Sequence, residues 1–225
     1  MRLPDPVAEL SRLLQGFEVV DLTNSVEDGM PYYPGDPRPT VMQWRSLRRD
    51  GVNLKLLILG SHSGTHVDAP AHFVDGGAAV DELGPMAFSG EAIVVDARGY
   101  REVPPDVVPL NPSRVLLIYT GISAAWRRGW VTDDYPYLSR EAAELLVKRG
   151  VRVVGIDSPS VDAPGAEEPI VHRMLLSQGV LIVENLSRNL GRLVGKRVWF
   201  LCLPLPIRSG DGAPARALAL VPRRR

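Results

Sequence analysis

The chain has 225 residues, of which 45% are hydrophobic and 23% charged, a composition typical of a globular protein and unlike that of a disordered one. Lysine and arginine number 26 together, as do aspartate and glutamate. The formal net charge of zero therefore indicates no strong attraction to nucleic acid or to a membrane surface. We expect one domain spanning residues 1–225.

Two further features bear on where the protein acts. No apolar run approaches the ~18 residues that cross a bilayer, and the first residues lack the basic and then apolar pattern of a signal peptide. Cys202 is the single cysteine and lies in an apolar stretch, so we expect a buried, inert thiol. Together these features predict a cytoplasmic protein.

The predicted elements begin with a short helix at 7–14, where apolar residues recur at helical spacing. A strand at 17–22 leads into the loop 29–37, whose prolines and glycines forbid regular structure and which presents Tyr32 and Tyr33. Ser139 to Arg149 predicts the clearest helix, with a serine cap and basic residues in its last turn. Short β-branched or leucine-rich runs predict further strands at 40–44, 53–59, 92–96, 115–119, 151–156, 180–183 and 197–203. This order of elements indicates a mixed α/β fold.

Three of the four histidines fall in the run 61–73. On a strand or extended loop, His62, His66 and Asp68 would point to one side, because they are separated by even numbers of residues. Gly64 and Pro70 argue against a helix at this point. Three such side chains on one face are able to bind a metal ion and still leave positions open for water.

A second ion is expected beside the first. Asp68 has two carboxylate oxygens that are able to bridge two ions, and His172 with Glu184 would complete the second site if the fold brings their segments over the first. Imidazole and carboxylate ligands suit zinc, manganese or ferrous iron. Gly64 would allow close backbone approach, and Thr65 would support the ligands through a hydrogen bond.

His72 is not needed as a ligand in this scheme and would lie at the rim of the site. An imidazole beside an activated water is suited to accept a proton from that water and to donate one to the leaving group. The alternative is that His72 is a further ligand to one of the ions. Asp157, Ser160 and Asp162 are expected to support the site or to build a turn.

The run from His62 to Phe73 resembles the H-x-G-T-H-x-D-x-P-x-H-F signature of the metal-dependent cyclase superfamily. This superfamily includes bacterial kynurenine formamidases (arylformamidases), isatin hydrolase and proteins named as polyketide cyclases. Further segments resemble the family along nearly the whole chain, at 21–23, 31–36, 120–122, 155–162, 172–173, 183–186 and 212–216.

The resemblance implies specific roles for these residues. His62, His66 and Asp68 would bind one metal, and Asp68, His172 and Glu184 would bind the other, with zinc usual and manganese known in isatin hydrolase. His72 would be the proton donor and acceptor. The implied fold is a swivelling β/β/α arrangement with a mostly parallel sheet, an antiparallel sheet and helices outside, in a homodimer or homotetramer.

The resulting prediction is a metal-dependent amidohydrolase, similar to kynurenine formamidase, in which metal-activated water cleaves a linear or cyclic small-molecule amide. Tyr32 and Tyr33 are the expected substrate-binding residues, and Trp126 or Trp130 would shape the pocket or lie in the core or an interface. Formamidases of the family usually carry tryptophan where this chain has Tyr33. The alternatives are a cyclase or lyase, an isatin or cyclic-imide hydrolase, and a metal-binding protein without turnover.

Overall fold

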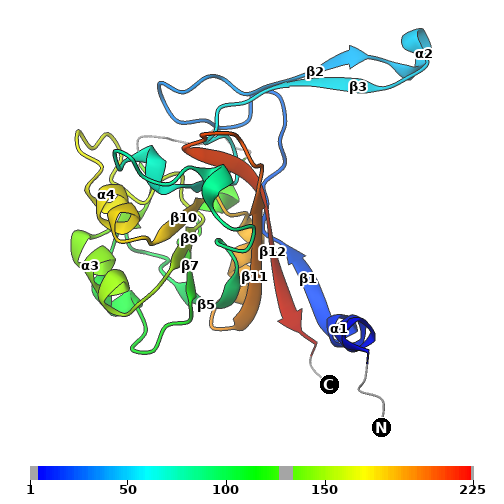
Figure 1. Cartoon of the computed structure of the whole chain (residues 1–225). Helices are drawn as coiled ribbons and strands as arrows, with labels where there is room; N and C mark the ends of the chain where they lie inside the picture. The colour runs from blue at the N-terminus through cyan, green and yellow to red at the C-terminus, as the bar shows by residue number, and fades with distance from the viewer. Residues whose placement is uncertain (1–4, 127–133, 224–225) are drawn as a thin grey trace.

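The structure is a computed structural model that describes residues 5–126 and 134–223. Its centre is one continuous sheet (Figure 1). In spatial order the strands are β1 (Phe17–Asp21), β12 (Gly212–Pro222), β11 (Arg197–Pro204), β5 (Gly90–Asp96), β7 (Val115–Tyr119), β9 (Val153–Ile156), β10 (Leu181–Glu184) and β4 (His66–Asp68). Because β4 also pairs with β12, the strands from β12 to β4 close into a barrel-like ring, and β1 extends it at the edge of β12.

Both kinds of strand pairing predicted from the resemblance occur, but they occur within this one sheet. Strands β5, β7, β9 and β10 pair in parallel. Strands β11, β12 and β4 join them through antiparallel pairs and so complete the ring. The mixed α/β class is therefore confirmed, whereas the expected pair of separate sheets is replaced by a closed one.

Two apolar layers hold the ring together, because successive strand residues face opposite sides. Leu117 on β7 faces inward, among buried residues of the other strands. Its neighbours Leu116 and Ile118 face outward, against the two helices α3 (Arg140–Lys148) and α4 (Ile170–Ser177). Ser139 caps α3 by accepting a hydrogen bond of 3.0 Å from the backbone N–H of Ala142, as predicted.

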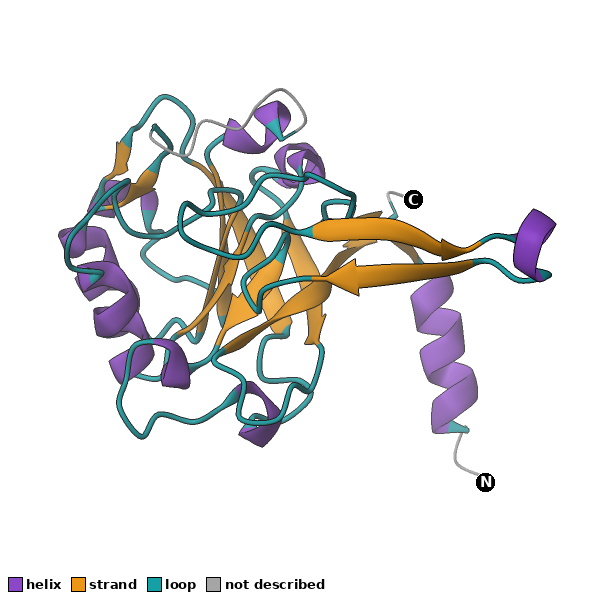
Figure 2. Ribbon diagram, turned by 90° about the horizontal axis from the view of Figure 1, so that it is seen from above, coloured by secondary structure: helices purple, strands orange, loops and turns teal. Residues whose placement is uncertain are grey.

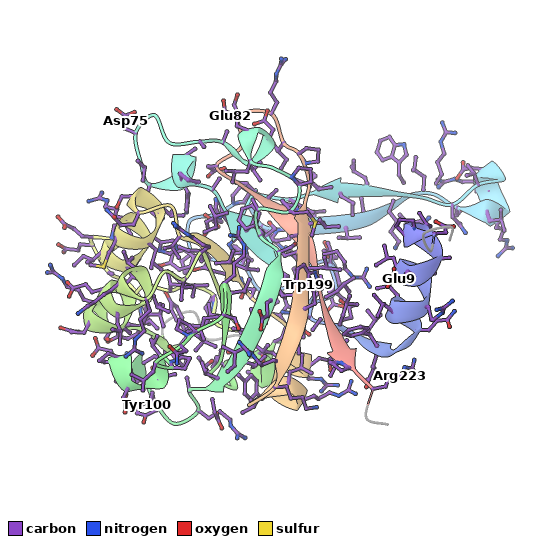
Figure 3. All side chains as sticks on the ribbon, turned by 60° about the horizontal axis from the view of Figure 1, so that its bottom comes forward. Glu9, Asp75, Glu82, Tyr100, Trp199 and Arg223 are labelled. Carbon is purple, nitrogen blue, oxygen red and sulfur yellow. The ribbon has the colours of Figure 1, made fainter. Side chains whose placement is uncertain are left out.

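Two parts of the chain stand away from the ring (Figures 1 and 2). The strands β2 (Thr40–Arg45) and β3 (Leu54–Ile58) form a separate antiparallel hairpin with the short helix α2 (Leu47–Asp50) at its tip. The helix α1 (Pro6–Gln15) has no buried residue, and Figure 3 shows it with Glu9 apart from the ring. The apolar side chains of both parts are exposed, apart from the half-buried Val41.

The predicted strands and helices are confirmed to within a few residues. The chain-order predictions did not include α4, β4, β12 or the short parallel pair β6 (Glu102–Val103) and β8 (Tyr137–Leu138). The 3₁₀ turns are η1 (Pro70–His72), η2 (Val80–Glu82), η3 (Pro105–Val107), η4 (Ile122–Ala125) and η5 (Arg188–Leu193). Among the described residues no helix has the length and apolarity needed to cross a membrane.

The apolar stretch around Cys202 is buried on one face only, because β11 alternates between the interior of the ring and solvent. Cys202 itself is fully buried, and burial raises the pKa of its thiol, in agreement with the inert role expected. Trp199, on the same strand, is 45% exposed on the outside (Figure 3).

Candidate metal centre and pocket

Strand β4 brings ligand residues from distant segments together. Its antiparallel register sets His66 opposite Glu184 and Asp68 opposite Ile182 on β10. On its other side, Asp68 lies opposite Gly212 at the start of β12. Because side chains alternate along a strand, His66 and Asp68 face the same side, as the sequence spacing predicted.

His62 reaches the same place by a different route from the one predicted. It does not lie on a strand, because β4 begins only at His66 and residues 61–65 form turns. Gly64 adopts a φ of +69°, which glycine tolerates far better than other residues. A Cβ at Gly212 would lie 2.6 Å from His62 Cε1, so the His62 ring occupies space that only glycine leaves free.

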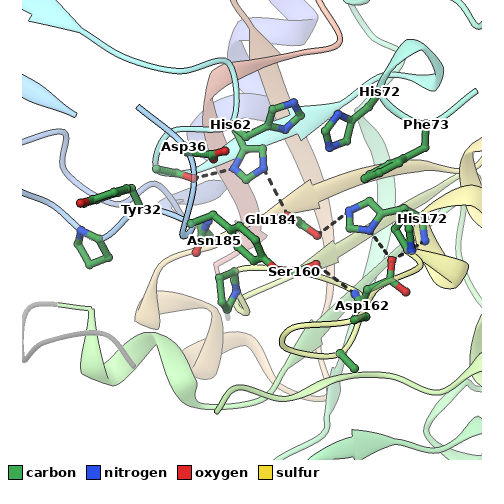
Figure 4. Close-up of a pocket in the computed structure, with 18 of the residues that line it drawn as sticks. Tyr32, Asp36, His62, His72, Phe73, Ser160, Asp162, His172, Glu184 and Asn185 are labelled. Atoms are coloured by element: carbon green, nitrogen blue, oxygen red, sulfur yellow. Dashed lines mark hydrogen bonds and ion pairs between the residues drawn. The ribbon is translucent and has the colours of Figure 1, made fainter. Parts of the chain in front are cut away.

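His172 is buried and lies in the first turn of α4. Asp162 holds that turn by accepting hydrogen bonds from the backbone N–H groups of Val171 and His172, at 2.8 and 3.0 Å. The same carboxylate contacts His172 Nδ1 at 2.6 Å (Figure 4), which directs Nε2 toward Asp68. Asp162 therefore has the supporting role expected of it.

The ligand atoms form two triads that share Asp68. In the first, Asp68 Oδ1 lies 2.8 Å from His62 Nδ1 and 3.4 Å from His66 Nε2. In the second, His172 Nε2 lies 3.3 Å from Asp68 Oδ2 and 3.2 Å from Glu184 Oε1. The candidate ligand atoms within each triad lie within 4.8 Å of one another. The structure thus brings together all five residues that the sequence singled out as ligands.

The chemistry of these groups fits two divalent cations. Asp68 Oδ2 is buried and faces His172 Nε2 at 3.3 Å without a well-aligned hydrogen bond within the described residues, a state that costs free energy unless a cation or a proton on His172 satisfies it. The donor set of three imidazoles and two carboxylates suits zinc or manganese. Five protein ligands for two ions leave coordination positions open, as in catalytic sites.

Each histidine ligand is also held through its other nitrogen, a common feature of metal sites. His66 Nδ1 lies 2.8 Å from the carbonyl oxygen of Gly64, and His172 Nδ1 is held by Asp162. His62 Nε2 lies 2.9 Å from Asp211 Oδ2. Asp211 was not predicted from the sequence. The one available signal was its place next to Gly212, in the segment that resembles the family's C-terminal strand.

The charges of the cluster perturb its pKa values strongly. Burial disfavours protonation of His66, but the carboxylates of Asp68 and Glu184 outweigh it and raise the pKa to about 10. The pKa of His172 is also raised, because Glu184 and Asp162 outweigh its burial. The pKa of Asp68 is well below its usual value, since histidine hydrogen bonds outweigh desolvation. The cluster thus attracts positive charge, whether protons or metal ions.

His72 lies beside this cluster at the end of η1. Its ring stacks on that of His62 at 3.9 Å, and its Nδ1 lies 3.3 Å from Asp211 Oδ2. Burial lowers its pKa, so that the ring is neutral near pH 7 and able to accept a proton. His72 belongs to neither triad around Asp68, but it does form a third candidate triad with His62 and Asp211.

A pocket opens over the two triads (Figure 4). Its cavity of about 330 Å³ lies within the range that holds small organic ligands. Tyr32, Tyr33, Phe73 and Trp126 form aromatic walls, with both tyrosines about 40% exposed. The opening loop therefore reaches the site, and Trp126 lines it while being largely buried. Trp130 lies outside the described residues.

The other residues expected near the site separate into two groups. Ser160 lines the pocket, and its hydroxyl accepts a hydrogen bond from the backbone N–H of Asp162. Asp157 instead organises a turn: its carboxylate, fully buried, accepts hydrogen bonds from the hydroxyls of Thr120 and Ser123, each at 2.7 Å. Burial raises the pKa of Asp157 despite these hydrogen bonds.

The fold and the site define the protein as a barrel-like α/β protein with a carboxylate–histidine centre suited to two metal ions. A family model described as "Putative cyclase" matches residues 20–163. The chain belongs to this Cyclase family.

Named relatives agree with this assignment. The chain is 32% identical to a kynurenine formamidase of Geobacillus thermodenitrificans over 203 residues, which cover 88% of this chain and 95% of the relative. Isatin hydrolase A from Labrenzia aggregata, solved with benzyl benzoate, superposes with a TM-score of 0.81 at 25% identity, over 96% of this chain and all of the other. A structure titled a potential metal-dependent hydrolase with cyclase activity gives a TM-score of 0.76 at 25% identity, over 93% and 100% of the two chains.

Proposed function

We propose that the protein is a metal-dependent hydrolase that cleaves the C–N bond of a small linear or cyclic amide, with activity like that of a kynurenine formamidase. The observation that carries this proposal is the pair of ligand triads that share Asp68 beneath a pocket that also holds His72. The similarity to a kynurenine formamidase and to isatin hydrolase A supports it.

His62, His66 and Asp68 would hold one ion, and Asp68, His172 and Glu184 would hold the second. We assign zinc to both positions, with manganese as the alternative, because imidazole and carboxylate ligands suit both metals. When bound, such ions polarise a carbonyl oxygen and make water more acidic.

The chain's own residues supply the proton transfers. In the net reaction, the oxygen of water bonds to the amide carbon, the C–N bond breaks, and the nitrogen leaves as an amine with an added proton. Asp211 faces His72 Nδ1, which leaves Nε2 to accept a proton from the attacking water and return it to the departing nitrogen. In a cyclic amide the same steps open the ring, and the nitrogen stays on the product.

The pocket walls set the kind of substrate that fits. Tyr32 and Tyr33 come from the opening loop, while Phe73 packs 4.1 Å from His72 between ring centroids. Aromatic side chains on several sides favour a flat ring next to the scissile amide. An aryl formamide and a fused cyclic amide such as isatin both meet this description.

The test is a metal analysis followed by kinetics on N-formylkynurenine and isatin. We expect about two ions per chain and turnover of at least one substrate. His72→Ala should lower kcat roughly 10²- to 10⁴-fold while both ions stay bound, whereas Glu184→Ala should lose metal first. Loss of metal from His72→Ala would instead make His72 a ligand, and a metal-loaded protein inactive on all amides would refute the proposed activity.

Isotope labelling distinguishes hydrolysis from a lyase or cyclase reaction at the same centre. Hydrolysis in H₂¹⁸O places the heavy oxygen in the carboxylate product, whereas ring closure or elimination without net hydrolysis does not. We expect incorporation of the label, since His72 lies where it would serve attack by water.

We also propose that the protein forms a homodimer or homotetramer. The exposed apolar side chains of α1 and of the β2–β3 hairpin support this, because neither element buries them against its own chain. A second copy of the same chain would cover them.

A further inference from the structure

Asn185 has an unusual backbone conformation directly after the ligand Glu184. Its φ is +55°, in the left-handed region that side chains other than glycine rarely adopt. Asparagine tolerates this region better than most residues, but glycine does so without steric cost. A strained non-glycine residue beside a reactive centre indicates that its side chain is used there.

The backbone of Asn185 is held on both sides, which fixes the direction of its Cα–Cβ bond. Its N–H donates to the carbonyl oxygen of Ser158 at 2.9 Å. Its own carbonyl oxygen accepts hydrogen bonds from Asn24 Nδ2 at 2.8 Å and from Thr65 Oγ1 at 2.6 Å. Thr65 Oγ1 in turn accepts from the backbone N–H of Asn24. Through these hydrogen bonds, Asn24 and Thr65 hold the backbone of Asn185 in place.

The side-chain oxygen of Asn185 is buried and has no hydrogen-bond partner in the part of the chain that the structure describes. Asn185 lines the pocket together with His66 and Glu184 (Figure 4) and is only 7% exposed. An unsatisfied buried acceptor is destabilising, and a donor brought by a ligand would remove that cost.

We propose that Asn185 accepts a hydrogen bond from the N–H of the substrate's scissile amide. This inference rests on the proposed amidohydrolase function and narrows its substrate class to amides that keep an N–H. Ions held by the two triads would act on amides and esters alike, since both present a carbonyl group. Asn185 Oδ1 distinguishes them, because an ester or an N-methyl amide offers it no donor and leaves it unsatisfied.

The test compares formanilide with phenyl formate and N-methylformanilide, which differ at the atom that Asn185 would contact. The variant Asn185→Gly removes the side chain and relaxes the backbone, because glycine adopts positive φ freely. We expect kcat/KM for formanilide to fall roughly 10- to 100-fold. The values for phenyl formate and N-methylformanilide should change less than about threefold, since neither makes the hydrogen bond.

Ser209→Gly is the matched control. Ser209 also has a positive φ, of +54°, but it does not line the pocket. We expect this variant to keep the wild-type preference for formanilide. Equal losses of kcat/KM for all three substrates in Asn185→Gly would overturn the inference, because they would mean that Asn185 only shapes the centre or donates to the carbonyl oxygen. Unchanged kinetics in Asn185→Gly would overturn it as well.

Binding is measured with turnover suppressed, in a His72→Ala background. Calorimetry should show that acetanilide binds metal-loaded His72→Ala more tightly than phenyl acetate and that adding Asn185→Gly removes this preference. If wild type hydrolyses none of the three formyl compounds but His72→Ala keeps the binding preference, the proposed reaction fails and the role of Asn185 stands. If His72→Ala shows no binding preference, the role of Asn185 fails whatever the kinetics.

Discussion

Asp211 lies between His62, a candidate metal ligand, and His72, the proposed proton-transfer residue. One carboxylate oxygen lies 2.9 Å from His62 Nε2 and 3.3 Å from His72 Nδ1, and the interaction with His62 helps to lower the pKa of Asp211 although burial opposes this. The carboxylate therefore orients both rings at once, and it strengthens His62 as a ligand.

Asp211→Asn keeps the shape of the side chain and removes its charge. We expect zinc affinity at the His62 position to fall roughly 10- to 100-fold, the usual effect of losing a carboxylate behind a histidine ligand. Competition with a zinc-chelating dye measures this, with the exposed Asp106→Asn as the control. Equal affinities for the two variants would mean that Asp211 contributes nothing to the ligand strength of His62.

Gly212 tests how tightly the centre is packed. A Cβ at this position would lie 2.5 Å from the carbonyl oxygen of Val67 and 2.6 Å from His62 Cε1, closer than real contacts allow. We expect Gly212→Ala to displace His62, so that the protein binds about one ion in place of two. Gly84→Ala, where a Cβ meets nothing within 4 Å, is the control and should keep both ions. Elemental analysis of both variants decides the matter.

At the scale of elements, the sequence predicted best the segments whose pattern is local. Val115–Tyr119 reads as a buried strand because each residue is apolar or aromatic, and it is one. β12 was indicated only by the resemblance at 212–216, because Pro214 and several alanines weaken its local pattern. It becomes a strand through pairing with β1, β4 and β11, contacts that no local pattern records.

The site residues follow the same rule: those set by local spacing were predicted, and some set by contacts between distant segments were missed. The spacing of His62, His66 and Asp68 predicted that their side chains lie close together, although His62 lies in a turn and not on a strand. Asp211 was missed because it contacts His62 across 149 residues of sequence. Asn185 was covered only by the resemblance at 183–186, since neither its φ nor the lack of a partner for its Oδ1 among the described residues is visible in the sequence.

The β2–β3 hairpin is the element whose exposed apolar side chains most favour packing against a second copy of the chain. An isolated two-stranded hairpin is marginally stable in water, yet this one has apolar residues on a shared face, among them Met42 opposite Leu56. We expect wild type to be a dimer or tetramer and Leu56→Glu to shift it to monomer, because a buried charge costs several kcal/mol. Light scattering during gel filtration measures the mass.

Leu110→Glu is the control for this shift, because Leu110 is 82% exposed in a loop remote from the hairpin. It should keep the wild-type mass. A wild-type protein that is monomeric at all concentrations would contradict the proposed assembly, and a Leu56→Glu protein of unchanged mass would place the interface elsewhere.

For the whole molecule, the metal centre ties together segments that are far apart in the chain. The ligands come from the turn before β4, from β4 itself, and from α4 and β10 more than 100 residues later. Ions bound there would therefore crosslink β4 to α4 and β10, and they would stabilise the folded state because the unfolded chain does not hold the ligands together.

This stabilisation should depend on pH with a definite sign. Without metal, the pKa of His66 is raised to about 10 in the folded protein from an ordinary value of 6.5. Its protonated form therefore contributes stability that is fully present below pH 6.5 and is lost as pH rises toward 10. Metal binding shows the opposite trend, because the ions must displace protons from His66 and His172, whose pKa values are both raised.

We therefore predict that the rise in Tm produced by zinc grows from about pH 6 to about pH 9, since the metal-free protein loses stability while zinc meets less competition from protons. Thermal unfolding with saturating zinc and with EDTA at each pH measures this difference, and calorimetry in buffers of different ionisation enthalpy counts the protons released. His66→Gln removes the main competing proton and the ligand together, so its zinc-dependent rise in Tm should be small at every pH. A rise in Tm that shrinks toward alkaline pH, or zinc binding without proton release near pH 7, would show that protons do not occupy these histidines in the metal-free fold.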